Sequence, residues 1–337
     1  MGKITSEHVL EPGLPEGLGS EQALDFISEM TVNQPVGANL ETVLIKACEG
    51  RLSRVNWFRT DWQRGGALTG YAKYFDDDDV EVPVVVKLPV PPVERLWLGR
   101  LQGAENVVPQ LYAHGDELNG YDMAWLVMER IPHGPLGSTW KGKQFDLVVA
   151  TAGRFYEAAN QFVTSGPPSE RDWNVILHRA RQNLYRREFP DVKQWNKALK
   201  RTQRRLKQWL SIWNDRATDQ WCHGDLHLGN AMTRSAPPHG PAILIDFALT
   251  HPGHWVEDGI YFEHLYWSSK EQLDDRRLCH QLAHERKRQG LAVEEDWPRL
   301  ASIKRMLLAM STPAQGHMDP RSLHVKCALQ ILEAGAE

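Results

Sequence analysis

The amino-acid sequence predicts an α+β protein, in which a strand-rich N-terminal part precedes a larger and mostly helical C-terminal part. Three runs rich in β-branched and aromatic residues follow one another between residues 54 and 90, separated by turn-forming stretches. Beyond about residue 140, apolar residues recur instead at the three- and four-residue spacing of amphipathic helices. We place the change between the two parts near residues 129–137.

The N-terminal part contains most of the predicted strands. Residues 1–19 are polar and rich in Pro and Gly, which indicates a loose leader, and Ser20 is placed to cap a short helix after it. Strand patterns occur in RVNWFRTDW, ALTGYAKYF, VEVPVVVKLPV and AWLVMERI, whereas ERLWLGRLQ has helical spacing. The second and third runs predict a hairpin with a solvated acidic tip at 76–79.

The C-terminal part is dominated by helical patterns, at 145–163, 173–188, 192–213, 276–290 and 300–311. One short apolar strand, AILIDFA, interrupts them. We therefore expect three consecutive segments: a leader and helix at 1–45, a strand-rich lobe at 46–131 and a helical lobe at 132–337.

Composition argues against several classes of protein. The chain has 337 residues, 42% of them hydrophobic, which is ample for two lobes with real cores. A formal net charge of -4 indicates neither a nucleic-acid partner nor an acidic disordered chain. The four cysteines are scattered without a CxxC pair, which favours a reducing cytoplasm. No apolar run approaches membrane length, so no membrane partner is expected.

Three polar residues carry the chemistry that we expect. Asp225 and Asn230 lie in one loop, HGDLHLGN, and Asp246 ends the apolar strand that follows. Carboxylate and amide oxygens suit Mg²⁺, which takes few protein ligands and keeps waters and phosphate oxygens. Asn230 and Asp246 therefore predict a site for Mg²⁺ with ATP, and Asp225 is left to orient a substrate hydroxyl and accept its proton.

These two motifs resemble the paired signatures of the aminoglycoside phosphotransferase and choline kinase-like superfamily. HGDLHLGN followed by ILIDFA carries the resemblance. It implies a protein kinase-like fold, with a small antiparallel-sheet N-lobe and a larger helical C-lobe. It also implies roles for individual residues: Asp225 as catalytic base, Asn230 and Asp246 as magnesium ligands, His223 and Gly224 as shapers of the loop, and Asp258 as a structural brace. His227 is kept as an accessory residue that contacts substrate or phosphate.

The same resemblance assigns nucleotide-binding residues to the strand-rich lobe. Lys87, in PVVVKLPV, is expected to hold phosphates of ATP or another nucleoside triphosphate, with Glu94 as its partner and Glu105 as the alternative. A phosphate-covering turn is expected at Gly65 and Gly66, with residues 49–54 as its rival. The backbone at Glu129 and Ile131 is expected to contact adenine.

The chain also departs from protein kinases. Ala248 stands where their glycine follows the metal carboxylate and phenylalanine, and no HRD or APE-like segment is found. HPGHW replaces the acidic, glycine-containing stretch that is more usual after the metal carboxylate. These differences argue against a peptide substrate and put the wall of the acceptor site in doubt.

Several other features have two interpretations. His223, His227, His251 and His254 fit no zinc-binding spacing, which favours loop histidines. The basic run 197–207 is interleaved with apolar residues, which favours a helix with one buried and one solvated face over an anion-binding segment. Four aromatic residues are either core residues or a box for a cationic amine: Trp221, Trp255, Tyr261 and Trp267.

The sequence therefore predicts an ATP-dependent phosphotransferase that acts on a hydroxyl of a small molecule such as an amino sugar, amino alcohol or sugar. The alternative is a catalytically silent, kinase-like nucleotide-binding or scaffolding protein. That class usually lacks the base, a metal ligand or the strand lysine, and all of these are present here. Four acidic residues are either receivers of a cationic acceptor or surface charges: Glu257, Glu263, Asp274 and Asp275.

Overall fold

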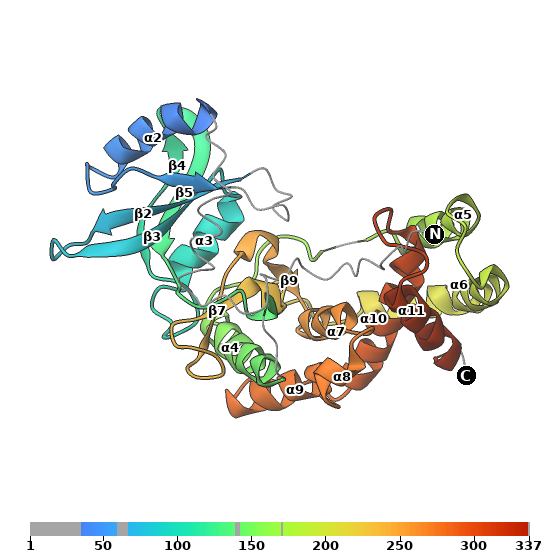
Figure 1. Ribbon diagram of the computed structural model, residues 1–337. Helices are drawn as coiled ribbons and strands as arrows, with labels where there is room; N and C mark the ends of the chain where they lie inside the picture. Colours follow the sequence, from blue (N-terminus) through green and yellow to red (C-terminus); the bar gives the residue numbers. More distant parts are fainter. Residues whose placement is uncertain (1–34, 59–66, 139–141, 170, 336–337) are drawn as a thin grey trace. The chain divides into compact units, whose positions relative to one another are not determined.

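The computed structural model describes residues 35–58, 67–138, 142–169 and 171–335, and it confirms the predicted α+β fold (Figure 1). The described residues form two compact units. One, the sheet unit, contains the residues up to Ala158 together with His227–Thr250. The other, the helical unit, contains Ala159–Leu226 and the residues from His251 onward. Both units are built from separated stretches of chain, and the three consecutive segments expected from the sequence stay a prediction.

The sheet unit is built on a five-stranded antiparallel sheet. Its strands are β1 (Asn56–Phe58), β2 (Leu68–Phe75), β3 (Glu81–Leu88), β4 (Leu111–Leu118) and β5 (Tyr121–Glu129), in the order β1-β2-β3-β5-β4. The predicted hairpin of β2 and β3 is confirmed. Its acidic tip is closed by Asp76, whose carboxylate accepts hydrogen bonds from the backbone N–H groups of Asp78 and Val80.

Strand β4 is absent from the sequence prediction. Its sequence, LYAHGDEL, alternates poorly, and its pairing with β5 is interrupted by two register shifts. Gly115 lies between these shifts. The indole of Trp125 leaves no room for a side chain at this position, since an added Cβ would lie 2.6 Å from Trp125 Nε1. A bulged strand with a glycine at its centre carries little of the period-two signal that identifies strands.

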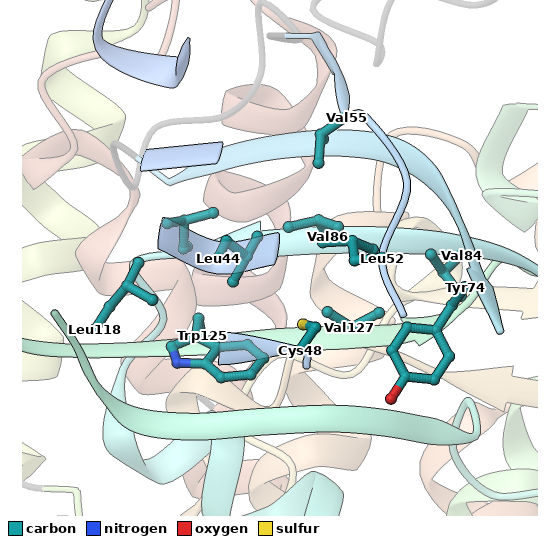
Figure 2. Packing of buried hydrophobic residues seen from close by; sticks show 11 residues of the cluster. Leu44, Cys48, Leu52, Val55, Tyr74, Val84, Val86, Leu118, Trp125 and Val127 are labelled. Carbon is teal, nitrogen blue, oxygen red and sulfur yellow. The ribbon is translucent and has the colours of Figure 1, made fainter. Parts of the chain in front are cut away.

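One face of the sheet is covered by helix α2 (Pro35–Ala47) and the turn after it (Figure 2). Leu44, Cys48 and Leu52 pack there on Val86 and Val127. Burying each such aliphatic side chain contributes about 1.5–3 kcal/mol. Helix α2 was not predicted, and the short helix predicted after Ser20 lies outside the described residues.

The remaining elements of the sheet unit are two helices, α3 and α4, and a short two-stranded ribbon. Helix α3 (Pro92–Arg100) confirms the helical spacing after β3, and α4 (Lys143–Ala159) follows the sheet in sequence. Trp97 of α3, Phe155 of α4 and Phe247 form an aromatic cluster, with ring centroids 6.1 and 5.8 Å apart. A two-stranded ribbon of β7 (Ala231–Thr233) and β8 (Ala242–Leu244) lies against α4, because Thr151 Oγ1 donates to the carbonyl of Ala242 at 2.9 Å.

The helical unit consists of long amphipathic helices and one small ribbon. The helices are α5 (Trp173–Arg186), α6 (Val192–Asn214), α7 (Val256–Leu265), α8 (Lys270–Leu273), α9 (Leu278–Arg288), α10 (Trp297–Ser311) and α11 (Leu323–Ala334). The ribbon pairs β6 (Gln220–Cys222) with β9 (His251–Gly253). Helix α6 has the predicted two faces, since Trp195, Leu199 and Leu206 are buried while Lys200 and Lys207 are exposed. Within the described residues, no helix is long and apolar enough to cross a membrane.

Candidate active site

Lys87 lies between two carboxylates of the sheet unit. Its ammonium nitrogen is 2.7 Å from Glu94 Oε1 and 2.9 Å from Glu94 Oε2, and 3.7 Å from Asp246 Oδ1. Burial of Lys87 favours the neutral amine, but the charges of Glu94 and Asp246 outweigh it and raise the pKa of Lys87. Glu94 is therefore the partner of Lys87, while the alternative Glu105 is exposed.

Asn230 and Asp246 emerge at the same end of the β7–β8 ribbon. Ala231 pairs with Leu244 in the ribbon, and the backbone N–H of Ile245 donates to the carbonyl of Asn230 at 3.0 Å. The two candidate metal ligands thus directly flank this ladder. Asp246 has a positive φ of 62°, and 41% of its side chain is exposed. A partly exposed carboxylate and an amide oxygen beside a cationic lysine form a donor set that fits Mg²⁺ with phosphate oxygens.

The loop before these ligands is held by helix α7 in the helical unit. Asp258 accepts hydrogen bonds from the backbone N–H groups of His223 at 2.8 Å and Gly224 at 2.9 Å. Gly224 has φ +84°, a left-handed conformation that glycine adopts without steric cost. His223 is fully buried, and its Nδ1 accepts a hydrogen bond from the N–H of Asp225. These contacts fix the backbone on both sides of the predicted base.

The side chain of Asp225 also contacts α7. Tyr261 donates its phenol O–H to Asp225 Oδ1 over 2.6 Å. Sequence analysis missed this role, although Tyr261 follows Asp258 by three residues and so faces the same way on a helix. His227, the predicted accessory residue, caps the 3₁₀ turn Leu228–Asn230, since its Nδ1 accepts from the N–H of Gly229 at 2.9 Å.

The predicted adenine contacts lie at the end of β5. The N–H of Glu129 already donates to the carbonyl of Gln110, so an adenine contact at Glu129 would fall to its carbonyl. The Glu129 carboxylate binds Arg234 through two hydrogen bonds of 2.7 Å, a pairing that the sequence did not suggest. Ile131 is buried, and within the described part of the chain no hydrogen bond uses its N–H.

The structure describes only one of the two candidate phosphate-covering turns, the segment 49–54. Gly65 and Gly66 lie outside the described residues, in the segment that leads into β2. The rival segment, 49–54, runs beside the other end of β2, where the N–H of Phe75 donates to the carbonyl of Arg51. Its Leu52 belongs to the buried core, and the choice between the two turns stays a prediction.

Two of the four acidic candidates for acceptor binding are buried and internally paired. Arg216 donates two hydrogen bonds to Glu257 Oε1 at 2.9 and 3.1 Å, and Lys304 lies 3.4 Å from Oε2. Burial of Glu257 favours its neutral form, but Lys304 and Arg216 outweigh this and lower its pKa. Glu263 is likewise bound by Arg305 at 2.7 Å. The exposed Asp274 lies 3.3 Å from Arg276, and Asp275 is exposed.

His251 lies in a cluster of three side chains of the kinds that bind metal ions. Ligand atoms of Cys222, His251 and Glu257 are within 4.8 Å of one another. The Glu257 carboxylate, however, already accepts from Arg216 and Lys304, and two cations at that carboxylate oppose a third. Burial raises the pKa of the Cys222 thiol well above its usual range, which favours the neutral thiol over the thiolate that a metal would need.

Three of the four aromatic residues considered for a cation-binding box are core residues. Trp255 packs on Trp297 with ring centroids 5.4 Å apart, and Trp221 donates its indole N–H to the carbonyl of Phe162. Trp267 is buried. Tyr261 instead donates to Asp225, as described above.

A model of the phosphotransferase enzyme family matches residues 70–303, a stretch that contains Lys87, Glu94, Asp225, Asn230 and Asp246. The chain belongs to this family. The predicted resemblance to aminoglycoside phosphotransferases and choline kinase-like enzymes is thereby confirmed. The search of curated proteins found no significant match to this phosphotransferase.

Solved structures share the fold of this phosphotransferase. A spectinomycin phosphotransferase in complex with ADP and spectinomycin is 11% identical with a TM-score of 0.54, covering 90% of this chain and 99% of that one. A microcompartment-associated aminopropanol kinase is 14% identical with a TM-score of 0.51, covering 84% and 90%. A protein of Ralstonia eutropha JMP134, provisionally assigned as an aminoglycoside phosphotransferase, is 15% identical with a TM-score of 0.54, covering 89% and 96%. At these identities the likeness establishes the two-lobed fold.

Proposed function

We propose that this phosphotransferase transfers the γ-phosphate of ATP to a hydroxyl group of a small molecule. The observation that supports this most directly is the cluster of Lys87, Glu94 and Asp246. The enclosed carboxylate of Glu94 holds the ammonium group of Lys87 beside the partly exposed carboxylate of Asp246. An ammonium group kept in place in this way is suited to bind phosphate oxygens. Asn230, in the same compact unit, adds an amide oxygen next to Asp246.

Each residue has a defined task in the proposed reaction. Lys87 binds the phosphates of ATP, and Glu94 keeps its ammonium group oriented. Asn230 and Asp246 would hold Mg²⁺, which when bound supplies positive charge to the phosphate oxygens. Asp225 orients the acceptor hydroxyl and accepts its proton as the new O–P bond forms, while the bond from the γ-phosphorus to ADP breaks. Most of the rate acceleration then comes from positioning and charge neutralisation.

The alternative is a kinase-like protein that binds nucleotide without turnover. Retention of Lys87, Asp225, Asn230 and Asp246 argues against it, because a silent protein has no use for the base. The paired backbone contacts of Asp258 point the same way, since they fix a loop whose central side chain is that base.

Acceptor turnover gives the primary test. Purified protein with MgATP is assayed for ADP release across amino sugars, amino alcohols, sugars and other alcohols. The panel includes spectinomycin and aminopropanol, because two proteins of similar fold are a spectinomycin phosphotransferase and an aminopropanol kinase. We expect one class to be phosphorylated, and Asp225→Ala to lower kcat at least about 10²-fold because it removes the general base. Equal rates for wild type and Asp225→Ala on every acceptor would refute the proposed activity.

Nucleotide binding is tested separately by thermal unfolding. ATP at 100 times its Kd stabilises a protein by about 2.7 kcal/mol. We expect a rise in Tm that requires Mg²⁺ and that is lost in Asp246→Asn. A rise with ATP that is indifferent to Mg²⁺ would support the binding protein instead.

The proposal includes a cytoplasmic location, with a small molecule as the partner and neither nucleic acid nor membrane. Cys48, Cys222, Cys279 and Cys327 are buried and free of disulfide bonds, as expected of a protein in a reducing compartment. The basic residues of α6 are accounted for as the solvated side of an amphipathic helix.

A further inference from the structure

Helix α7 contacts the catalytic loop at two points, one turn apart. Asp258 accepts from the loop backbone at His223 and Gly224, and Tyr261 donates to the side chain of Asp225 at 2.6 Å. All these residues belong to the helical unit. The first contact explains how the loop backbone is held. The second acts on the Asp225 carboxylate itself, whereas the first acts on the loop backbone.

The phenol of Tyr261 is held from behind by other aromatic rings. Its ring centroid lies 5.6 Å from that of His264, which in turn lies 5.3 Å from Trp267 and 5.4 Å from His324. Trp267 stacks on His324 with an interplanar angle of 18°. Rings packed in this way have few alternative rotamers, so the hydroxyl of Tyr261 stays directed at Asp225.

The proton in this hydrogen bond belongs to the tyrosine. Burial of Tyr261, reinforced by the neighbouring charge of Asp225, raises the pKa of the phenol far above its ordinary value. At neutral pH the phenol is therefore always a donor. A donor at 2.6 Å stabilises the charged form of the carboxylate that receives it.

We propose that Tyr261 is a positioning residue, which holds the Asp225 carboxylate in one orientation and in its charged form, ready to accept the proton of the acceptor hydroxyl. This inference rests on the proposed function, in which Asp225 is the base. The hydroxyl of Tyr261 does not itself exchange a proton during turnover.

A pH profile separates this role from simple packing. The charged groups that act on the phenol are Asp225 and Arg171. Burial lowers the pKa of His264 and of His324 to about 4, so both histidines behind the phenol are neutral above pH 5. An acid limb that responds to removal of the Tyr261 hydroxyl is therefore assigned to Asp225.

The test compares Tyr261→Phe with the matched control Tyr266→Phe. Tyr266 follows the same helix and packs its ring on Phe262 with centroids 5.8 Å apart. With MgATP and the best acceptor of the panel, we expect Tyr261→Phe to lower kcat about 10- to 100-fold, less than the roughly 10²- to 10⁴-fold that the general base itself contributes. The KM values for ATP and acceptor should change less, by about twofold, because neither substrate loses a binding contact.

In the pH profile of kcat, the acid limb of Tyr261→Phe should move to higher pH by about one unit, since the charged carboxylate loses a donor. Tyr266→Phe should leave all these quantities at wild-type values.

A second measurement tests the contact without activity. In urea unfolding, Tyr261→Phe should lower the midpoint in the wild-type background and have a smaller effect in an Asp225→Ala background, where the phenol has already lost its acceptor. Equal effects in the two backgrounds overturn the inference. So does a Tyr261→Phe enzyme that turns over with wild-type kcat and an unmoved acid limb, and that result leaves the proposed function standing. Absence of turnover on every acceptor overturns the proposed function, and this inference with it.

Discussion

Glu94 is almost fully enclosed, with 1% of its side chain exposed, and it nevertheless pairs with Lys87. Enclosing an ion pair is expensive, because both groups lose their water, and a well-packed apolar pair of similar size is often as stable or more so. A chain selected for stability alone would gain little from this pair. Its position beside Asp246 suggests that the lysine is retained for a ligand.

Substitution of the pair should separate stability from nucleotide binding. Lys87→Met leaves Glu94 enclosed without a partner, so we expect it to lower the free energy of unfolding by about 3–5 kcal/mol. The double variant Lys87→Met/Glu94→Leu should recover most of that loss in urea unfolding. It should not recover the Tm increase given by MgATP. Recovery of both would mean that the pair is not part of the nucleotide site.

The two hydrogen bonds that Asp258 accepts from the loop backbone lead to a further prediction. Asp258→Asn replaces one of two acceptor oxygens with an N–H₂ group, so the N–H of either His223 or Gly224 is left enclosed without a partner. We expect a loss of about 1–3 kcal/mol in the free energy of unfolding. We also expect a fall in kcat at unchanged KM for ATP, measured under saturating acceptor. Unchanged kcat would contradict the role of Asp258 as the brace of the loop.

The difference between Asp225 and Tyr261 shows which residues of a site can be found from sequence. Asp225, Asn230 and Asp246 are predicted from the sequence because their spacing within two short motifs matches the proposed chemistry directly. Tyr261 lies 36 residues from its partner, and nothing near it in the sequence marks the contact. Its role depends on how α7 packs beside the loop. Arg234, which binds Glu129 from 105 residues away, escaped prediction for the same reason.

At the level of elements, the strength of the local pattern decided what could be predicted. The hairpin of β2 and β3 alternates regularly and the long helices have clear apolar faces, so both were predicted from the sequence. Strand β4 was not, because its two register shifts break the alternation. Helix α2 was not predicted, because its sequence begins with Pro, Val and Gly, of which Pro and Gly are poor helix formers. The purpose of its apolar residues becomes visible only when the sheet face that they cover is known.

The starts of α5 and α6 allow a matched test of helix capping. Asp172 accepts hydrogen bonds from the N–H groups of Asn174 and Val175, whereas Asp191 at the start of α6 caps nothing with its side chain. We expect Asp172→Ala to lower the free energy of unfolding by about 1 kcal/mol. Asp191→Asn, which preserves a residue tolerant of the left-handed conformation found there, should change it little. Urea unfolding of the two variants measures both; equal losses would contradict the capping assignment.

At the scale of the whole molecule, two neutral histidines tie folding to pH. Burial lowers the pKa of His264 and of His324 to about 4, whereas in the unfolded chain both bind protons near pH 6.5. Between these values the unfolded state holds more protons than the folded one, so stability is complete above pH 6.5 and is lost as pH falls toward 4. We expect a slope of about 1 kcal/mol per pH unit for each histidine in that window.

Urea unfolding at pH 7, 6 and 5 measures this slope. His324→Phe keeps a ring for Trp267 to stack on and removes one titrating group, so the slope should fall by about half. His284 is exposed, and His284→Asn should leave the slope as in the wild type. A slope unaffected by His324→Phe would show that other groups control stability in this range.

The double contact of α7 with the catalytic loop has a consequence for inhibition. Asp258 and Tyr261 join the loop to a helix that itself packs against α9 and α10. A compound that separated α7 from α10 would displace Asp225, the proposed base, without occupying the proposed nucleotide site or the proposed acceptor site. Selectivity among phosphotransferases can therefore be sought in the packing of the helices behind the loop that carries Asp225.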